Sequence, residues 1–306
     1  MNSNPLSPSQ SSHVQPELRR ANILGVGVHA INPPLALELI EATVADRRKG
    51  YVCVTGVHGV MEAQKDADLK VILNRSFLTT PDGMPTVWMG RWQGFSQMGR
   101  VYGPDLMLEV CRSSVLRGYT HFLYGGKPGV AEQLGTELCR RFPGLRVVGT
   151  FTPPFRDLDS LEEAELLSTV TKCKPDFFWV GLSTPKQERF MARYLDRLDT
   201  TLMLGVGAAF DVHTGGIRDA PDWVKDAGLQ WLHRLCQEPR RLWKRYFINN
   251  PKFLWKAASQ FVGLKIYSNY DATDHTRFTK DRMPPRVTTR TPATPEVQLG
   301  ASRTSE

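Results

Sequence analysis

The sequence of 306 residues lacks long apolar runs, a secretory signal and paired cysteines. It has no stretch of eighteen or more uncharged apolar residues, which excludes a membrane-spanning helix. The first twenty residues are rich in Ser, Pro and Gln and contain no apolar segment, so we expect no signal peptide. The five cysteines form no CxxC pair. Their pattern argues against a disulfide framework or structural zinc and favours free thiols in a reducing cytoplasm.

Several motifs of common enzyme classes are also missing. Neither GxGxxG, nor GxxxxGK[ST], nor GxSxG occurs, and the first absence argues against a nicotinamide-dependent oxidoreductase. Two DxD strings, at 66–68 and 157–159, could in principle hold a divalent ion, but neither follows a predicted strand. We therefore expect both to be solvated charges, and we expect chemistry that requires no metal and no other cofactor.

What the sequence does contain is typical of a globular α/β protein. Apolar residues make up 41% and charged residues 23%, and 39 basic against 31 acidic residues give a net charge of +8. Between residues 21 and 228, short continuous apolar runs alternate with helical stretches. This order favours a Rossmann-like, mostly parallel sheet with helices on both faces. We expect strands at 22–28, 51–55, 77–80, 121–124, 145–150, 176–181 and 202–206, and helices including 34–49, 104–117, 128–142, 161–172 and 185–197.

The pattern changes on either side of this core. Residues 1–20 and 268–306 are expected to be disordered tails, because they contain little that could be buried. Residues 229–267 show no strand pattern, and between residues 234 and 256 aromatic residues alternate with four arginines and three lysines. This composition is typical of helices that lie on a membrane surface. Two alternatives are a helical subdomain whose tryptophans are core residues, and an RNA-binding surface.

Ligands of an open parallel sheet bind beyond the carboxyl ends of its strands. Five polar or glycine-bearing loops follow predicted strands and should share one rim suited to a nucleotide. In one of them, Gly125, Gly126 and Lys127 lead into a helix, where free N–H groups and a lysine can hold a phosphate. The five loops are 55–59, 80–83, 125–129, 181–188 and 205–211, and the last contains Gly207.

Four polar residues in these loops have both a structural and a functional interpretation. Asp82 can close a turn or act as a general base, and His58 is the second candidate base because its ordinary pKa lies near neutrality. Gln187 can complete a capping box that begins at Thr184, or it can help to bind an anion at the helix start. Asp211 can cap a turn or accept a hydrogen bond from a ribose or uracil.

Seven segments, taken together and in order, resemble the WecG/TagA/CpsF family of bacterial glycosyltransferases (glycosyltransferase family 26). The resemblance covers about residues 20–260, and the PKQE, GAAFD and EPRRLWKRY strings are its most specific parts. The segments are TTPDGMPTVW (79–88), YGPDLM (102–107), FLYGGKPGVAEQL (122–134), FPGLRVVGT (142–150), PDFFWVGLSTPKQERFM (175–191), GVGAAFDVHTGG (205–216) and WLHRLCQEPRRLWKRYFINNPKFL (231–254).

The resemblance implies a reaction and its partners. It implies inverting, metal-independent transfer of a sugar, often of N-acetylmannosamine type, from a UDP-sugar to a polyprenyl-diphosphate-linked acceptor in surface polysaccharide synthesis. The enzyme would be cytoplasmic and peripheral on the inner face of the plasma membrane, would bind no nucleic acid and could form a homo-oligomer. The alternative from another class is a non-catalytic α/β protein that binds nucleotides or nucleic acid.

The resemblance also implies roles for individual residues. Asp82 matches the catalytic base, Gln187 and Asp211 match nucleotide contacts, and the arginines at 234, 241 and 245 match those that complete the site at the membrane. Two positions depart from the family pattern. Gly56 stands where Asn is common, so we expect Thr55 and His58 to take over sugar or acceptor contacts. The RAP string reads Arg218-Asp219-Ala220-Pro221, which places the role of that arginine in question.

Overall fold

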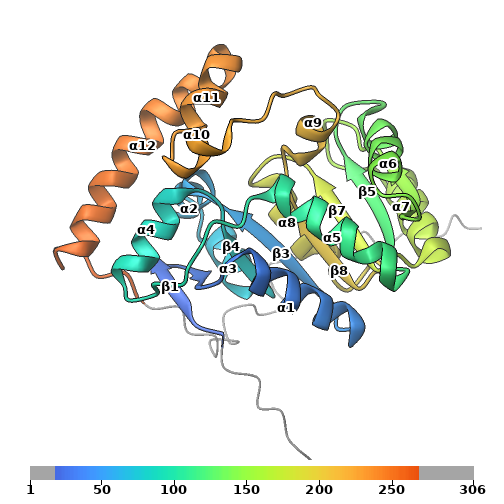
Figure 1. The fold of residues 1–306 in the computed structure, drawn as a ribbon, viewed down its shortest axis with the longest axis horizontal. Helices are drawn as coiled ribbons and strands as arrows, with labels where there is room; N and C mark the ends of the chain where they lie inside the picture. Colours follow the sequence, from blue (N-terminus) through green and yellow to red (C-terminus); the bar gives the residue numbers. More distant parts are fainter. Residues whose placement is uncertain (1–17, 269–306) are drawn as a thin grey trace, which may run out of the picture. The chain divides into compact units, whose positions relative to one another are not determined.

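The computed structural model describes residues 18–268 (Figure 1). The two predicted tails, 1–20 and 268–306, lie outside this range except for residues 18–20 and 268. The predicted fold class is confirmed: the central element is a sheet of six strands that all pair in parallel, flanked by helices on both faces. The strands lie in the order β4-β3-β8-β7-β5-β6. Their bounds are β3 Gly50–Thr55, β4 Leu78–Pro81, β5 Thr120–Gly125, β6 Arg146–Phe151, β7 Phe177–Gly181 and β8 Leu202–Gly205.

Successive residues of the central strands enter two separate hydrophobic cores. On β7, Phe178 packs into one core and Trp179 into the other, and on β8 Met203 and Leu204 divide in the same way. This double burial explains why these strands read as continuous apolar runs. The covering helices are α1 Pro33–Ala45, α2 Val57–Ala63, α3 Ala67–Arg75, α4 Met84–Trp92, α5 Gly103–Arg117, α6 Val130–Arg141, α7 Ser160–Cys173, α8 Lys186–Tyr194 and α9 Ala209–His213.

The strand predicted at 22–28 is wrong. The segment is a hairpin of β1 (Arg20–Ile23) and β2 (Val26–His29), which pair antiparallel as a separate two-stranded sheet. Leu24 and Gly25 form the turn and both have positive φ angles, 54° and 83°. Two positive φ angles in a two-residue turn match the right-handed twist of the flanking strands. The prediction failed because the turn residue Leu24 is apolar and buried, so it extends the hydrophobic run.

The direction of the chain connections reverses at the carboxyl ends of β5 and β7. The chain leaves β5 toward the sheet edge at β6, whereas it leaves β7 in the opposite direction toward β8. Adjacent strands whose connections diverge leave an opening above the sheet, and ligands of open α/β folds bind at such points. The fold therefore places the loops 125–129 and 181–188 at the position expected for a ligand.

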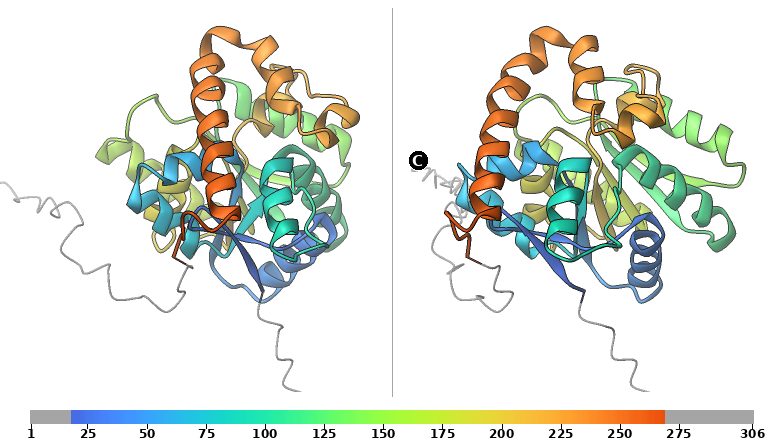
Figure 2. Two further views of the ribbon diagram at one scale, coloured as in Figure 1. Left: turned by 90° about the vertical axis from the view of Figure 1, so that its left-hand side faces the viewer. Right: turned by 60° about the vertical axis from the view of Figure 1, so that its left-hand side comes forward.

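Three helices follow the sheet: α10 (Asp222–Asp226), α11 (Gln230–Gln237) and α12 (Pro239–Phe261). Phe253 and Ala257 of α12 enter the core that also contains α2 and α3, and α12 runs along the side of the molecule in Figures 1 and 2. Trp243 and Trp255 are 48% and 73% exposed, so the alternative in which these tryptophans are core residues is wrong. No helix within residues 18–268 is both long enough and apolar enough to cross a membrane.

Candidate active site

Asp82 lies at the carboxyl end of β4, where the loop after β3 comes very close to it. Its backbone N–H donates a hydrogen bond to the carbonyl of Thr55, 3.0 Å away. A Cβ atom on Gly56 would lie only 2.5 Å from the Asp82 carbonyl oxygen, a distance that real side chains do not reach. The departure from the family pattern at position 56 therefore has a structural reason in this chain: only glycine allows the two loops to approach this closely.

The environment of Asp82 makes its carboxyl group a better base than an ordinary aspartate. Burial raises the pKa of Asp82 to about 6, against the opposing influence of Arg100 and Arg234, and Asp105 adds to the increase. A general base is most effective when its pKa lies near the working pH, because it is then both ionised and basic. Asp82 thus combines a position on the sheet rim with a pKa suited to accepting a proton near neutrality.

Thr55 ends β3, the strand that pairs with β4, and His58 lies in the helix α2 that follows it; both differ from Asp82 in chemistry. His58 is in the first turn of α2, and burial, together with the nearby Arg245, lowers its pKa to about 4. It is therefore neutral at pH 7 and a weaker base than Asp82, but it can still form a hydrogen bond with a ligand. Thr55 is buried, and its hydroxyl donates to the carbonyl of Cys53 at 3.3 Å.

The C-terminal helices bring two of the three predicted arginines to this corner of the sheet. Arg234, on α11, lies close enough to Asp82 to lower its pKa. Arg245, on α12, lies beside His58, and burial lowers the pKa of its own guanidinium. Arg241 is exposed and pairs with Glu238 at 2.6 Å. Guanidinium groups that are far from Asp82 in the sequence thus lie at the same end of the sheet as this candidate base.

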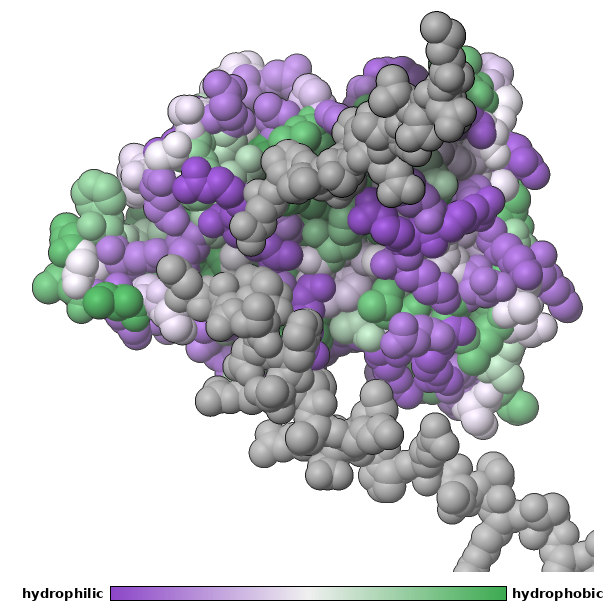
Figure 3. All heavy atoms as spheres, turned by 90° about the horizontal axis from the view of Figure 1, so that it is seen from below, coloured by the Kyte–Doolittle hydropathy of each residue, from purple (hydrophilic) through white to green (hydrophobic). Residues whose placement is uncertain are grey.

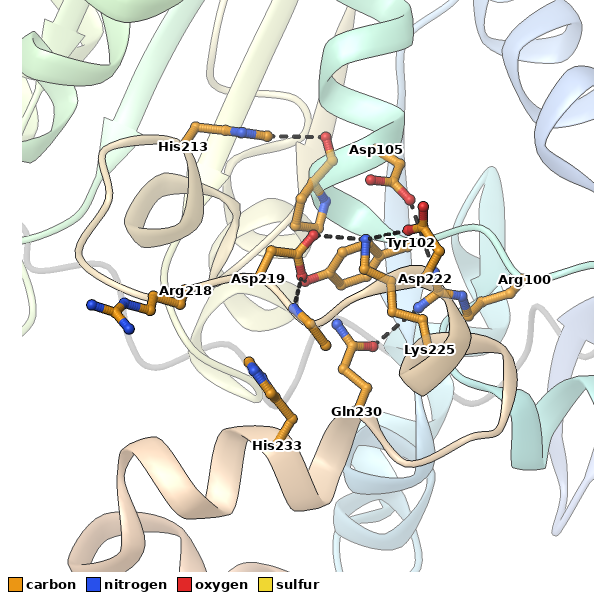
Figure 4. Close-up of polar contacts among 12 residues, drawn as sticks. Arg100, Tyr102, Asp105, His213, Arg218, Asp219, Asp222, Lys225, Gln230 and His233 are labelled. Carbon is orange, nitrogen blue, oxygen red and sulfur yellow. Dashed lines mark hydrogen bonds and ion pairs between the residues drawn. The ribbon is translucent and has the colours of Figure 1, made fainter.

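A polar network holds the segment before α11 against the start of α5 (Figure 4). The Tyr102 hydroxyl donates to Asp219 at 3.0 Å, and the buried ammonium of Lys225 pairs with Asp219 at 2.7 Å. Arg100 donates to Gln230, the first residue of α11, at 3.1 Å. Burial alone would lower the pKa of Lys225, but the contacts with Asp219 and other nearby carboxylates raise it. The network therefore fixes where α11, and with it Arg234, is attached to the core.

This network shows which residue of the string Arg218-Asp219-Ala220-Pro221 contacts the core. Arg218 is exposed and points away from the cluster, whereas Asp219 points into it (Figure 4). Sequence reasoning singled out Arg218 and missed Arg100, Tyr102, Asp219 and Lys225. Two signals in the sequence lead to this network: the string YGPDLM begins with Tyr102, and the string at 218–221 contains Asp219.

The other half of the rim is built from glycines that allow close backbone contact. Gly125 has a φ of 127°, and a Cβ atom there would lie 2.7 Å from the backbone of Gly181. Gly126 donates its N–H to the Gly181 carbonyl at 3.1 Å. The ring of Phe210 lies against both loops, within 2.6 Å of where a Gly181 Cβ would be. The predicted phosphate loop is thus held in a shape that side chains would prevent.

Gln187 does not close a capping box, and that interpretation is wrong. The helix α8 begins at Lys186, and the buried Gln187 amide instead donates to Glu188 and to the Gly205 carbonyl, at 3.2 and 3.3 Å. Because a carbonyl can only accept, the amide nitrogen must face Gly205, and the oxygen is left facing Gly207. Thr184 donates to the buried Glu188 carboxylate at 2.8 Å, so it is not available as a cap.

The remaining predicted residues lie at the border of the rim or serve other purposes. Lys127 is exposed after Gly126, and the half-buried Asp211 accepts the Ile217 N–H through its backbone carbonyl at 3.0 Å. The aspartates at 66 and 159 are not simply solvated, because their side chains cap α3 and α7. Within residues 18–268, no cluster of three or more His, Cys, Asp or Glu side chains could hold a metal ion.

The structure therefore groups the predicted residues into two neighbouring sets. The first set lies at the ends of β3 and β4 and on the helices that meet them, and it offers a base, a neutral imidazole and guanidinium groups. The second lies at the carboxyl ends of β5, β7 and β8 and offers a glycine-rich backbone and the start of α6. A base next to fixed cations and an anion-binding loop can together remove a proton from a nucleophile and stabilise a departing phosphate. The residues of the two sets are Asp82, Thr55, His58, Arg234 and Arg245, and Gly125, Gly126, Gln187 and Gly207.

Comparisons with known proteins identify the family of this chain. Residues 21–266 match the Glycosyl transferase WecG/TagA/CpsF family. Two similar proteins are both named N-acetylglucosaminyldiphosphoundecaprenol N-acetyl-beta-D-mannosaminyltransferase. The protein from Bacillus subtilis (strain 168) is 26% identical over 242 residues, which cover 79% of this chain and 92% of the relative. The protein from Bacillus spizizenii (strain W23) is 26% identical over 216 residues, which cover 70% and 81%. The chain belongs to the WecG/TagA/CpsF family and is a glycosyltransferase.

Proposed function

We propose that this enzyme transfers a sugar from a UDP-sugar to a sugar linked to polyprenyl diphosphate, with inversion and without a metal ion. The observation that carries the proposal is the carboxyl group of Asp82 at the end of β4, which has a pKa of about 6 and lies close to Arg100 and to Arg234 of α11. The names of the relatives support N-acetylmannosamine as the sugar and N-acetylglucosaminyl diphosphoundecaprenol as the acceptor.

In the proposed reaction, Asp82 takes the proton from the acceptor hydroxyl as that oxygen attacks the anomeric carbon of the donor. The bond from this carbon to the UDP oxygen breaks, and UDP leaves with the electron pair. A single displacement of this kind inverts the anomeric configuration. Removal of the proton by a positioned base contributes about 10²–10⁴ in rate.

The charge that develops on UDP requires stabilisation, and the rim offers it without an added ion. Backbone N–H groups after β5 can receive the diphosphate, and the exposed Lys127 adds a positive charge. We assign Gln187, Gly207 and Asp211 to the nucleotide and His58 to the acceptor. Arg234 and Arg245, with Arg241 at the exposed side, would bind the acceptor diphosphate.

The lipid of the acceptor gives residues 229–267 a role. Their helices carry exposed basic and aromatic side chains, including Lys244, Lys252 and Trp255. Near an anionic leaflet each basic residue contributes about 1 kcal/mol of attraction. We propose that this segment holds the enzyme on the inner face of the plasma membrane, where the lipid-linked acceptor is available.

The test is UDP release from a panel of UDP-sugars, measured with and without N-acetylglucosaminyl diphosphoundecaprenol and with EDTA present throughout. The proposal predicts acceptor-dependent release with one donor, and a β-linked disaccharide product by NMR if that donor has an α-linkage. Release that stops in EDTA and returns with Mg²⁺ would contradict metal independence. Nucleotide binding without release from any donor would favour the non-catalytic alternative.

A further inference from the structure

The helix α4 carries two tryptophans on its exposed face. Trp88 and Trp92 are four residues apart, so they lie on the same side of the helix, and they are 40% and 61% exposed. The opposite side, with Val87, Met89 and Gly90, is buried. Neighbouring exposed apolar side chains of this size are typical of a surface that binds a partner or a membrane.

The fold places this face next to the exposed side of α12, although the two helices are far apart in the sequence. The Trp92 ring packs against Phe261, with centroids 5.4 Å apart, and Trp88 lies against Gly228, just before α11. The right-hand view of Figure 2 shows α4 beside α12. In Figure 3, hydrophobic residues gather at the end of the molecule to which α12 extends. Exposed apolar residues of these segments include Trp88, Trp92, Leu254, Trp255, Phe261 and Leu264.

The segments that contain α4 and α12 carry charged side chains of positive sign only. Neither residues 83–104 nor residues 239–268 contain an aspartate or a glutamate. Exposed basic residues lie on both, among them Arg91 on α4 and Lys252 and Lys265 on or after α12. A surface that combines exposed tryptophans with basic groups and no acidic ones matches an anionic bilayer, where indole rings lie at the headgroup level and cations meet lipid phosphates.

From this juxtaposition we propose that α4 is a second membrane-contacting element, and that Trp88 and Trp92 enter the headgroup region of an anionic bilayer together with α12. The inference rests on the proposed function, which already assigns residues 229–267 to the membrane, and it extends that contact to a helix of the α/β core. It has a consequence for catalysis, because α4 starts at Met84, two residues after Asp82. At 1.5 Å per residue, Trp92 lies only about 12 Å along the helix from Met84, so contact through α4 would hold Asp82 close to the headgroups and to the acceptor diphosphate.

The experiment compares binding of the full-length protein to sedimented vesicles of phosphatidylcholine with and without phosphatidylglycerol. The double variant Trp88→Gln/Trp92→Gln is expected to lower the partition coefficient on anionic vesicles at least about tenfold, because it removes exposed apolar area from the contact. The matched control is Phe155→Gln, an 84% exposed aromatic residue after β6, at the opposite sheet edge from β4. It is expected to bind like the wild type.

A second measurement covers the case in which the double variant does not fold. Environment-sensitive dyes placed at Trp92→Cys and at Phe155→Cys, each with the exposed Cys236 replaced by Ser, should respond differently to vesicles. The dye at position 92 is expected to shift to the blue and the dye at position 155 to remain unchanged.

Three results would overturn the proposal in distinguishable ways. Equal vesicle binding by the wild type and the double variant, with loss in Trp255→Gln, would restrict the contact to α12 and leave the proposed function intact. Failure of the wild type to bind anionic vesicles would remove the membrane contact altogether, while UDP release with a detergent-solubilised acceptor would still test the transfer reaction. A change in self-association, without a change in vesicle binding, would assign the surface to a second copy of the chain.

Discussion

The two halves of the sheet rim are built in different ways. At β5, β7 and β8 the backbone forms the site: glycines let loops touch, and a Cβ on Gly125 would lie 2.7 Å from the neighbouring loop. At β3 and β4 side chains form it, and they come from segments as far apart as Asp82 and Arg245. The backbone half suits a diphosphate, which is bound by N–H groups, whereas the side-chain half suits proton transfer, which needs a tuned pKa.

The difference has a consequence for how each half tolerates change. The backbone half depends on shape, so an added methyl group should weaken both folding and nucleotide binding. The side-chain half depends on charge, so conservative substitutions should leave the fold intact and change rates or pH dependence. Substitutions in each half should therefore separate nucleotide binding from chemistry.

The largest effect is expected for Asp82→Asn. Loss of the base should lower acceptor-dependent transfer about 10²–10⁴-fold, while UDP affinity measured by calorimetry stays the same.

Because burial raises the pKa of Asp82 from 3.8 to about 6, the carboxyl group costs stability once it is ionised in the folded state. That cost is absent below about pH 4, grows between the two pKa values and is complete above about pH 6. Compared with the wild type, Asp82→Asn should therefore have a higher urea midpoint at pH 8 and the same midpoint at pH 4. If the variant and the wild type have the same midpoint at pH 8 as well, this assignment is contradicted.

A smaller loss is expected for Gly56→Ala, which tests whether the close approach of two loops positions the base. The added Cβ would lie 2.5 Å from the Asp82 carbonyl, so the Asp82 loop must move. A displacement of about 1 Å at a catalytic group can cost about 10²-fold in rate. UDP affinity should change little. Gly135→Ala on α6, where a Cβ would meet its neighbours at 3.5 Å, is the control and should retain full activity.

In the backbone half, Gly125→Ala should impair binding rather than chemistry. The variant combines a positive φ of 127° with a clash against Gly181, and such strain costs about 1–3 kcal/mol. We expect a lower urea midpoint and roughly tenfold weaker UDP binding. Gly129→Ala also has a positive φ but meets nothing within 4 Å, so it isolates strain from the clash. Equal UDP affinity in both variants would show that close contact with Gly181 does not shape the binding loop.

The smallest effect is expected at the network that attaches α11. Lys225→Met removes a buried cation between Asp219 and Asp222, and we expect a several-fold lower transfer rate because Arg234 is held less firmly. Asp222→Asn removes only the outer partner, whose side chain is 92% exposed, and should behave like the wild type. If Lys225→Met keeps its full rate, the network supports the fold and does not position the arginine.

Much of the sheet could be predicted from the sequence, because buried parallel strands are continuous apolar runs. The run FFWVG stands out for this reason, and the structure has it as β7 (Phe177–Gly181). The hairpin at residues 20–29 could not be predicted, because the buried Leu24 hides the turn within an apolar stretch.

Some residues of the candidate site could likewise be predicted from the sequence, and others could not. Asp82 and Gly125 could be found because Asp82 directly follows β4 and Gly125 ends β5, and the ends of parallel strands meet on one rim. The network of Arg100, Tyr102 and Asp219 could not, because Tyr102 and Asp219 lie 117 residues apart and meet only through tertiary packing. A capping box was one of two interpretations of Gln187, because its spacing from Thr184 fits that motif, whereas the fold uses its amide to bond the Gly205 carbonyl at the end of β8.

The most direct test of the central claim, that Arg234 of α11 lies close enough to Asp82 to act on its pKa, is the pH dependence of kcat/KM. For the wild type we predict an ascending limb with an apparent pKa of about 6. In Arg234→Gln this limb should move to higher pH, because Arg234 lowers the pKa of Asp82, whereas Arg240→Gln, at an exposed position, should leave it in place. A limb that stays unchanged in Arg234→Gln would contradict the claim that α11 completes the active site.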